Sequence, residues 1–178
     1  MRVAHPMAVR TILCFPDERL RATGRRVTAF DAELKKLVDD MAETMYAAPG
    51  VGLAAPQIGV ALRLFIVDVF AGDDEHPSDL HVFVNPEIVE RHGETVGEEG
   101  CLSFPDVREE VRRAERITIR AQDVTGRPFE LETDGFLAVA IQHEYDHLDG
   151  VLLVDHLSLL RRRLVQRAMA KRAAEVAG

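Results

Sequence analysis

The run AIQHEYDHLDG at residues 140–150 constrains the fold most, because it predicts a helix that carries part of a metal site. Four residues of an α-helix advance by about 400°, so His143 and His147 project from one face, one turn apart. Glu144 stands beside them, within reach of a bound water and not required as a ligand. The spacing is that of zinc protease helices, but so short a motif also arises by chance on an ordinary polar helix face.

The third ligand decides between kinds of metal site. The longer protease pattern places a histidine at position 153, where this chain has Leu153, and His156 comes three residues too late. The alternative protease ligand is a downstream glutamate, and only Glu175 remains. Cys101, in EEGCLSFP, is a better candidate, since a thiolate and two imidazoles form a three-ligand set with an open fourth position. The other reading of a lone cysteine, a small buried hydrophobe, is the one we apply to Cys14.

Hydrophobic periodicity predicts an α+β fold in which mostly antiparallel strands surround the central metal-binding helix. Three helices are expected, from the N-cap Asp31 to Pro49-Gly50, from Asp134-Gly135 to near Gly150, and over 156–176. Four strands are expected, over 62–69, 81–90, 116–124 and 128–133. The chain is expected to form one catalytic domain over residues 1–178, with residues 1–10 as a flexible extension.

Composition is that of a globular protein, with 47% hydrophobic residues, and no apolar run approaches the about 20 residues of a membrane helix. We read no secretory signal, and two cysteines fit a reducing cytoplasm better than a disulfide framework. The net charge of −8 is uneven, because residues 161–178 hold six Lys or Arg and one Glu, leaving −13 on residues 1–160. This basic tail is either a solvated helix face or a contact for a polyanion.

Three segments taken together resemble the signatures of bacterial peptide deformylases. They are GVGLAAPQ at 50–57, EGCLS at 99–103 and QHEYDHLDG at 142–150, in the family's order. The first segment alone is equally well read as a helix-to-strand loop packed with alanines. The similarity covers residues 11 to 175, and the family implies removal of the formyl group from the N-terminal methionine of new proteins, with release of formate.

The resemblance also implies roles for individual residues. A metal-bound water attacks the formyl carbon, and one divalent ion is expected, Fe²⁺ in vivo, with Zn²⁺, Ni²⁺ or Co²⁺ able to substitute. The implied ligands are Cys101, His143 and His147, the general acid/base is Glu144, and the oxyanion donors are Gln57 and the backbone N–H of Leu102. The implied substrate contacts are the Gly52 backbone, an apolar wall for methionine made by Val51, Phe136, Val139 and Ala140, and the bracing residues Glu99 and Arg108.

The chain departs from the family's pattern at Gly97, where many bacterial members carry a larger apolar residue near the pocket. The expected partners are N-formylmethionyl nascent peptides and ribosomal RNA, the latter through residues 161–172 on a helix whose inner stripe is Leu157, Leu160, Leu164 and Ala168. We expect a monomer. Two rival functions remain, a zinc metalloprotease that cleaves internal peptide bonds and tolerates Cys101→Ser, and a metal-stabilised binding domain without turnover.

Overall fold

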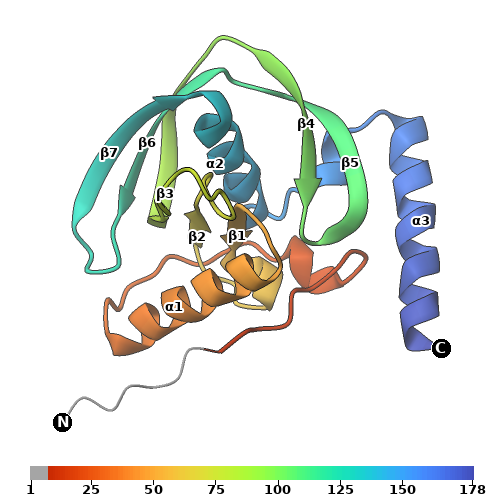
Figure 1. Cartoon of the computed structure of the whole chain (residues 1–178), viewed down its shortest axis with the longest axis horizontal. Coiled ribbons are helices and arrows are strands. Elements are labelled where there is room, and N and C mark those ends of the chain that lie inside the picture. Colours follow the sequence, from red (N-terminus) through yellow and green to blue (C-terminus); the bar gives the residue numbers. More distant parts are fainter. Residues whose placement is uncertain (1–7) are drawn as a thin grey trace.

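The computed structural model describes residues 8–178, in which two β-sheets and three α-helices confirm the predicted α+β class (Figure 1). The helices are α1 (Ala32–Ala47), α2 (Gly135–Leu148) and α3 (Leu159–Ala177), with short 3-10 helices η1 (Glu18–Arg21), η2 (Ala55–Ile58) and η3 (Leu153–His156). The strands are β1 (Gly52–Ala54), β2 (Leu64–Val67), β3 (His81–His92), β4 (Thr95–Cys101), β5 (Phe104–Arg113), β6 (Arg116–Gln122) and β7 (Pro128–Asp134).

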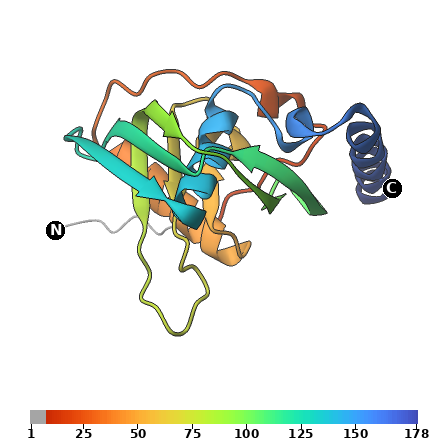
Figure 2. The same ribbon diagram turned by 90° about the horizontal axis from the view of Figure 1, so that it is seen from above.

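The larger sheet has the order β1-β2-β3-β6-β7, and all its neighbouring strands are antiparallel. Its two faces are covered by different helices because side chains alternate along a strand. Phe65 of β2 packs in the cluster that includes α2, whereas its neighbour Ile66 packs in the cluster that includes α1. Figures 1 and 2 show α1 and α2 on either side of this sheet. The sheet therefore gives α2 a rigid floor.

Local sequence signals determine the elements that were predicted. Asp31 caps α1, its carboxylate accepting a hydrogen bond from the Leu34 N–H at 3.0 Å, and Val38, Met41 and Met45 form the buried face. The four predicted strands correspond to β2, β3, β6 and β7, and the second predicted helix corresponds to α2. These predictions are confirmed within a few residues at each end.

The hairpin formed by β4 and β5 was not predicted. Its strands pair from Thr95↔Arg113 to Gly100↔Arg108, and a register shift then brings Cys101 opposite Phe104. Phe104 and Val111 hold the hairpin against a third hydrophobic cluster, which also contains η3 and two residues of α3. This packing places the end of β4 beside α2, and so brings Cys101 close to His143 and His147.

The N-terminal segment differs from the prediction at two places. Residues 1–7 of the predicted flexible extension lie outside the described residues, but residues 8–10 are held against α1. The Ala8 N–H donates to Asp40 at 2.9 Å, and the Arg10 guanidinium donates twice to the same carboxylate, at 3.0 and 2.7 Å. Cys14 was predicted to be buried and is exposed, because the alternating segment turns Leu13 into the core and Cys14 outward.

The C-terminal helix begins later than predicted and presents a different face to the core. Val165 and Met169 are buried, whereas Leu160 and Leu164 are 68% and 45% exposed, and Ala168 is also exposed. The predicted inner stripe is therefore wrong beyond Leu157, which does pack against the third cluster. The orientation is fixed by Arg162, which lies on the buried side and donates to two backbone carbonyls of η3, at 3.0 and 3.2 Å.

Within residues 8–178, no helix is long and apolar enough to span a membrane.

Candidate metal centre

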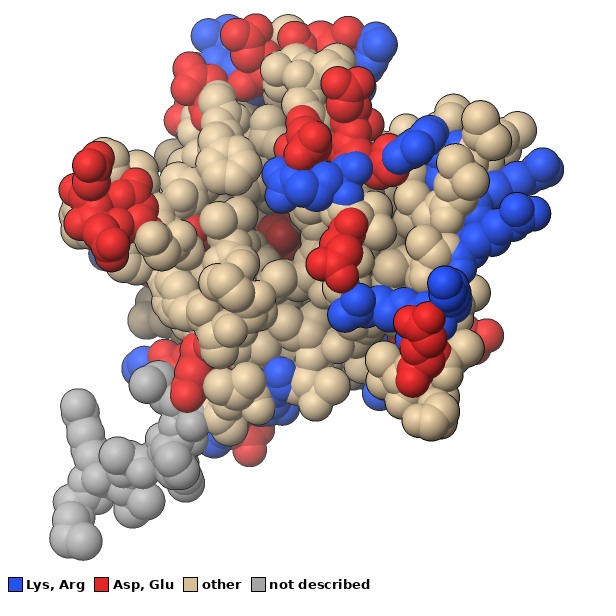
Figure 3. All heavy atoms as spheres, turned by 45° about the vertical axis from the view of Figure 1, so that its right-hand side comes forward, with Lys and Arg blue, Asp and Glu red and all other residues tan. Residues whose placement is uncertain are grey.

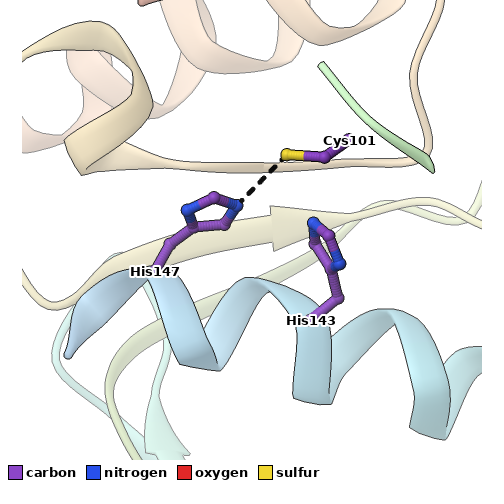
Figure 4. Close-up of side chains that lie close together, drawn as sticks. All are labelled: Cys101, His143 and His147. Atoms are coloured by element: carbon purple, nitrogen blue, oxygen red, sulfur yellow. Dashed lines mark hydrogen bonds between the residues drawn. The ribbon is translucent and has the colours of Figure 1, made fainter. Parts of the chain in front are cut away.

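Helix α2 and the end of β4 bring Cys101, His143 and His147 together. One ligand atom from each side chain lies within 4.8 Å of the other two, and the Cys101 sulfur is 3.5 Å from His147 Nε2 (Figure 4). The two imidazole rings meet edge to face with centroids 5.2 Å apart, as expected for side chains one helical turn apart. A buried thiol with two imidazoles is a donor set that fits Zn²⁺ or Fe²⁺ and leaves a coordination position open.

Glu99, two residues before Cys101, orients His143. The His143 Nδ1–H donates to Glu99 Oε1 at 2.9 Å, which leaves Nε2 with a free lone pair for a metal. Burial alone would raise the pKa of Glu99, but its ion pair with Arg113 and its hydrogen bond with His143 lower that pKa to about 2. Glu99 is therefore a permanent carboxylate at neutral pH.

Arg113 holds Glu99 in place and was not identified from the sequence. Its Nε and Nη2 each donate to one Glu99 oxygen at 2.9 Å, and its Nη1 donates to Asp146 Oδ2 at 2.7 Å. Arg108, which was expected to brace the site together with Glu99, does not contact Glu99: it is exposed and pairs with Glu98 at 2.6 Å. The inward alternation of β5, which buries Val111 and Arg113, is the signal that points to the correct arginine.

Glu144 lies against strand β1 and is almost fully buried. Its Oε2 has no hydrogen-bond partner among the described residues, and an ideal Cβ on Gly52 would lie 2.5 Å from its Oε1. Only glycine at position 52 leaves room for this carboxylate. Burial raises the pKa of Glu144 to about 7.

The pKa values of the two histidines are shifted in opposite directions. Burial and then the neighbouring His143 lower the pKa of His147 to about 3, so its imidazole is neutral. Burial also opposes a charge on His143, but the nearby Cys101 sulfur and Glu99 outweigh it and raise the pKa of His143.

Gln57 points its amide toward the same centre. Its Oε1 accepts the Ala54 N–H at 2.9 Å, and this fixes the amide so that Nε2 faces the opposite way. Nε2 donates to the Ser103 hydroxyl at 3.1 Å and lies 3.6 Å from the Cys101 sulfur. Ser103, fully buried, is a neighbour that the sequence did not assign.

A cleft of about 650 Å³ opens onto His143 and Glu144. Its walls include all the predicted substrate contacts, namely Val51, Gly52, Glu99, Arg108, Phe136, Val139 and Ala140, and also Leu102, a predicted oxyanion donor. Phe136 stands at the mouth and is 58% exposed. In Figure 3 the molecule is hollowed near the middle of this face, with acidic atoms deep in the hollow. Gly97 is exposed on β4, where an added Cβ would meet no atom within 4 Å.

Comparisons with known proteins agree on one family. The family model described as Polypeptide deformylase matches residues 9–163. A peptide deformylase of Chromobacterium violaceum is 51% identical over 166 residues, which are 93% of this chain and 97% of the relative. One from Polynucleobacter necessarius is 47% identical over 173 residues, 97% and 99% of the two chains.

Solved structures give the same result. The crystal structure of a peptide deformylase from Legionella pneumophila has a TM-score of 0.88 and 49% identity, covering 96% of this chain and 98% of the other. That of an Ehrlichia chaffeensis peptide deformylase in complex with actinonin has a TM-score of 0.87 and 34% identity, covering 93% and 98%. The chain therefore belongs to the peptide deformylase family, the metal-dependent hydrolases that remove the formyl group from N-formylmethionine.

Proposed function

We propose that Cys101, His143 and His147 hold one divalent ion, and that Glu144 is the acid/base of the deformylation reaction. The observation that carries the proposal is the buried cluster of three ligand atoms at the bottom of a cleft, with Glu144 beside it. The ion is Fe²⁺ in vivo, and Zn²⁺, Ni²⁺ or Co²⁺ can replace it, because the thiolate and imidazole ligands accept all four. When bound, it polarises a carbonyl oxygen and lowers the pKa of a water molecule to about 7.

Glu144 moves the proton. Its Oε2 has no protein partner among the described residues, so it is free to accept the proton of the attacking water. The same carboxyl then returns the proton to the leaving amine, which releases formate and a free N-terminus. Gly52 keeps this carboxylate close to β1, and burial keeps it out of bulk water.

Gln57 Nε2–H and the Leu102 backbone N–H stabilise the negative charge that develops on the formyl oxygen. The amide of Gln57 is already turned toward Cys101 by the Ala54 N–H, so its orientation costs little during the reaction. Loss of one such donor typically lowers the rate about 10²–10³-fold.

The methionine side chain packs in the cleft against an apolar wall from α2, with Val51 on the opposite side. The wall consists of Phe136, Val139 and Ala140. The peptide backbone runs along Gly52, whose strand β1 is an edge of the larger sheet and lines the cleft. Glu99 and Arg108 complete the cleft wall, Glu99 from behind His143 and Arg108 at the exposed rim.

We further propose that the whole chain acts as one catalytic domain and as a monomer in the cytoplasm, and that α3 contacts ribosomal RNA. Lys and Arg gather over α3, on the right of Figure 3. Because α3 contributes Val165 and Met169 to the core, substitution tests this contact better than deletion. Alanine at Arg163, Arg167 and Lys171 should weaken ribosome binding and flatten its salt dependence. Unchanged binding at low salt would exclude the contact.

The test of the catalytic proposal is formate release from N-formyl-Met-Ala-Ser by the Fe²⁺-loaded chain under anaerobic conditions. Wild type should release formate, while Glu144→Ala and Cys101→Ser should not. Cleavage of unblocked internal peptide bonds together with an active Cys101→Ser would favour the metalloprotease instead. Metal-dependent melting without turnover would favour a binding domain.

A further inference from the structure

A continuous line of charged hydrogen bonds leads from His143 to the surface of the molecule. His143 donates to Glu99, and Glu99 accepts two bonds from Arg113, each of the three at 2.9 Å. Arg113 Nη1 then donates to Asp146 Oδ2 at 2.7 Å, and His156 Nε2 donates to the same oxygen at 2.7 Å. The exposed fraction of the side chain rises along this line, from 7% and 6% for Glu99 and Arg113 to 24% and 27% for Asp146 and His156.

His156 lies outside all three deformylase signatures, on η3 between α2 and α3. Its backbone is anchored, because Arg162 of α3 donates to the carbonyls of Val154 and Asp155 on the same short helix. The Asp155 carboxylate in turn accepts the Leu152 N–H at 2.8 Å and pairs with Arg21. The imidazole is therefore presented to Asp146 by a fixed element, and that element is tied to the C-terminal helix.

The line also separates two cavities. Glu99 and His143 line the catalytic cleft, whereas Arg113, Asp146 and His156 line a second cavity of about 410 Å³ behind it. The ion pair between Arg113 and Glu99 joins a residue that lines the second cavity to one that lines the cleft. A change at His156 thus reaches the metal ligand from the rear cavity, without touching the substrate side.

The orientation of the Asp146 carboxylate depends on its hydrogen bond with His156. Asp146 Oδ2 is the oxygen that orients Arg113, and a partly buried carboxylate with a single partner is free to turn toward water in the rear cavity. If Asp146 turns, Arg113 keeps only Glu99, and the ion pair that fixes the Glu99 oxygen under His143 Nδ1 loosens. Partners that orient a metal-binding histidine typically contribute about 10–100-fold to metal affinity or activity.

We propose that His156 is a positioning residue for His143, acting through Asp146, Arg113 and Glu99. The inference rests on the proposed role of His143 as a metal ligand. It assigns to η3, and to the α3 helix that anchors it, a direct mechanical link to the metal centre.

The test compares His156→Ala, His156→Gln and wild type, with His92→Ala as the matched control. Gln keeps an N–H donor at a similar reach, and His92 is another surface histidine bonded to a carboxylate, Glu90 at 3.1 Å, but its line of bonds ends there. For each variant, kcat and KM for N-formyl-Met-Ala-Ser, the rate of Co²⁺ loss to EDTA, the visible spectrum of the Co²⁺ form and the thermal unfolding curve are measured.

His156→Ala should lower kcat about tenfold with little change in KM, and should speed Co²⁺ loss by about the same factor. Its Co²⁺ bands should shift, His156→Gln should recover most of each effect, and His92→Ala should match wild type.

The proposal is overturned if Co²⁺ loss, spectrum and kcat of His156→Ala equal those of wild type. It is also overturned if the Gln variant is as impaired as Ala and both have merely lost thermal stability. Absence of formate release from wild type would refute the proposed function, but the Co²⁺ measurements would still decide the role of His156.

Discussion

Gly52→Ala tests whether the position of the Glu144 carboxylate depends on the absence of a side chain at residue 52. An ideal Cβ at this position would lie 2.5 Å from Glu144 Oε1 and 2.9 Å from both Cδ and Cγ, all inside van der Waals contact. A carbon contact relaxes to about 3.5 Å, so the carboxylate must retreat by about 1 Å or β1 must shift. Because β1 is hydrogen-bonded to β2 at Gly52↔Val67, the side chain is the part that gives way.

A displacement of about 1 Å in a reacting group costs about 10²-fold in rate. Gly52→Ala should therefore lower kcat for formate release from N-formyl-Met-Ala-Ser about 100-fold. The added methyl group should also reduce the free energy of unfolding by about 1–3 kcal/mol, measured in urea.

Gly97→Ala is the matched control. It lies on the neighbouring hairpin, and its added Cβ meets no atom within 4 Å, so activity and stability should stay at wild-type values. Full activity in Gly52→Ala would show that Glu144 does not depend on the space beside the glycine. Equal losses in both variants would show that the effect comes from glycine itself and not from this contact.

Four further substitutions test the packing and the ion pairs. Arg113→Leu leaves two largely buried carboxylates without their cation and should lower the free energy of unfolding by about 3–5 kcal/mol in urea; a change near zero would contradict this. Met169→Ala, in the core, should lower the free energy of unfolding by about 2–5 kcal/mol. Leu160→Ala, on the exposed face of α3, should change it by no more than about 0.5 kcal/mol. If thermal melts showed the larger loss for Leu160→Ala, they would favour the buried face of α3 that was predicted from the sequence. Burial opposes ionisation of Asp40, but its hydrogen bonds with Arg10 and other donors outweigh burial and lower its pKa to about 2. The Asp40 carboxylate therefore stabilises the fold fully above about pH 4, and this contribution is lost as the pH falls through about 2. The stability advantage of wild type over Asp40→Asn in urea should therefore shrink between pH 4 and pH 2, and a constant difference would contradict the ion pair.

Elements with a strong local signal were predictable from the sequence. The capped, periodic α1 and the four apolar strands follow from residues within each segment, as does the placement of His143 and His147 on one helical face. The strands of the β4–β5 hairpin carry no such signal, since TVGEEGC and FPDVREEVRR are rich in charge and glycine. What orders this hairpin is its pairing and the contact of Phe104 and Val111 with η3 and α3, distant in sequence.

The candidate site shows the same division. Cys101, His143 and His147 were predicted to be metal ligands from residue type and spacing, together with the family resemblance, and the structure brings these three side chains together. The arginine that holds Glu99 was missed because Arg108 and Arg113 both lie in a charged segment, and the folded β5 buries Arg113 beside Glu99 while Arg108 faces solvent. The face of α3 depends in the same way on tertiary contacts, here the bonds of Arg162 to η3.

The most direct test of the proposed metal site is a metal titration of the metal-free chain under anaerobic conditions. Fe²⁺ is added in steps, and bound metal and formate release from N-formyl-Met-Ala-Ser are measured at each step. Activity should rise linearly from zero and stop at one ion per chain, with neither tight binding nor activity in Cys101→Ser or His143→Ala. Turnover by the metal-free chain, or one tightly bound ion in Cys101→Ser, would show that these three side chains do not form the catalytic metal site.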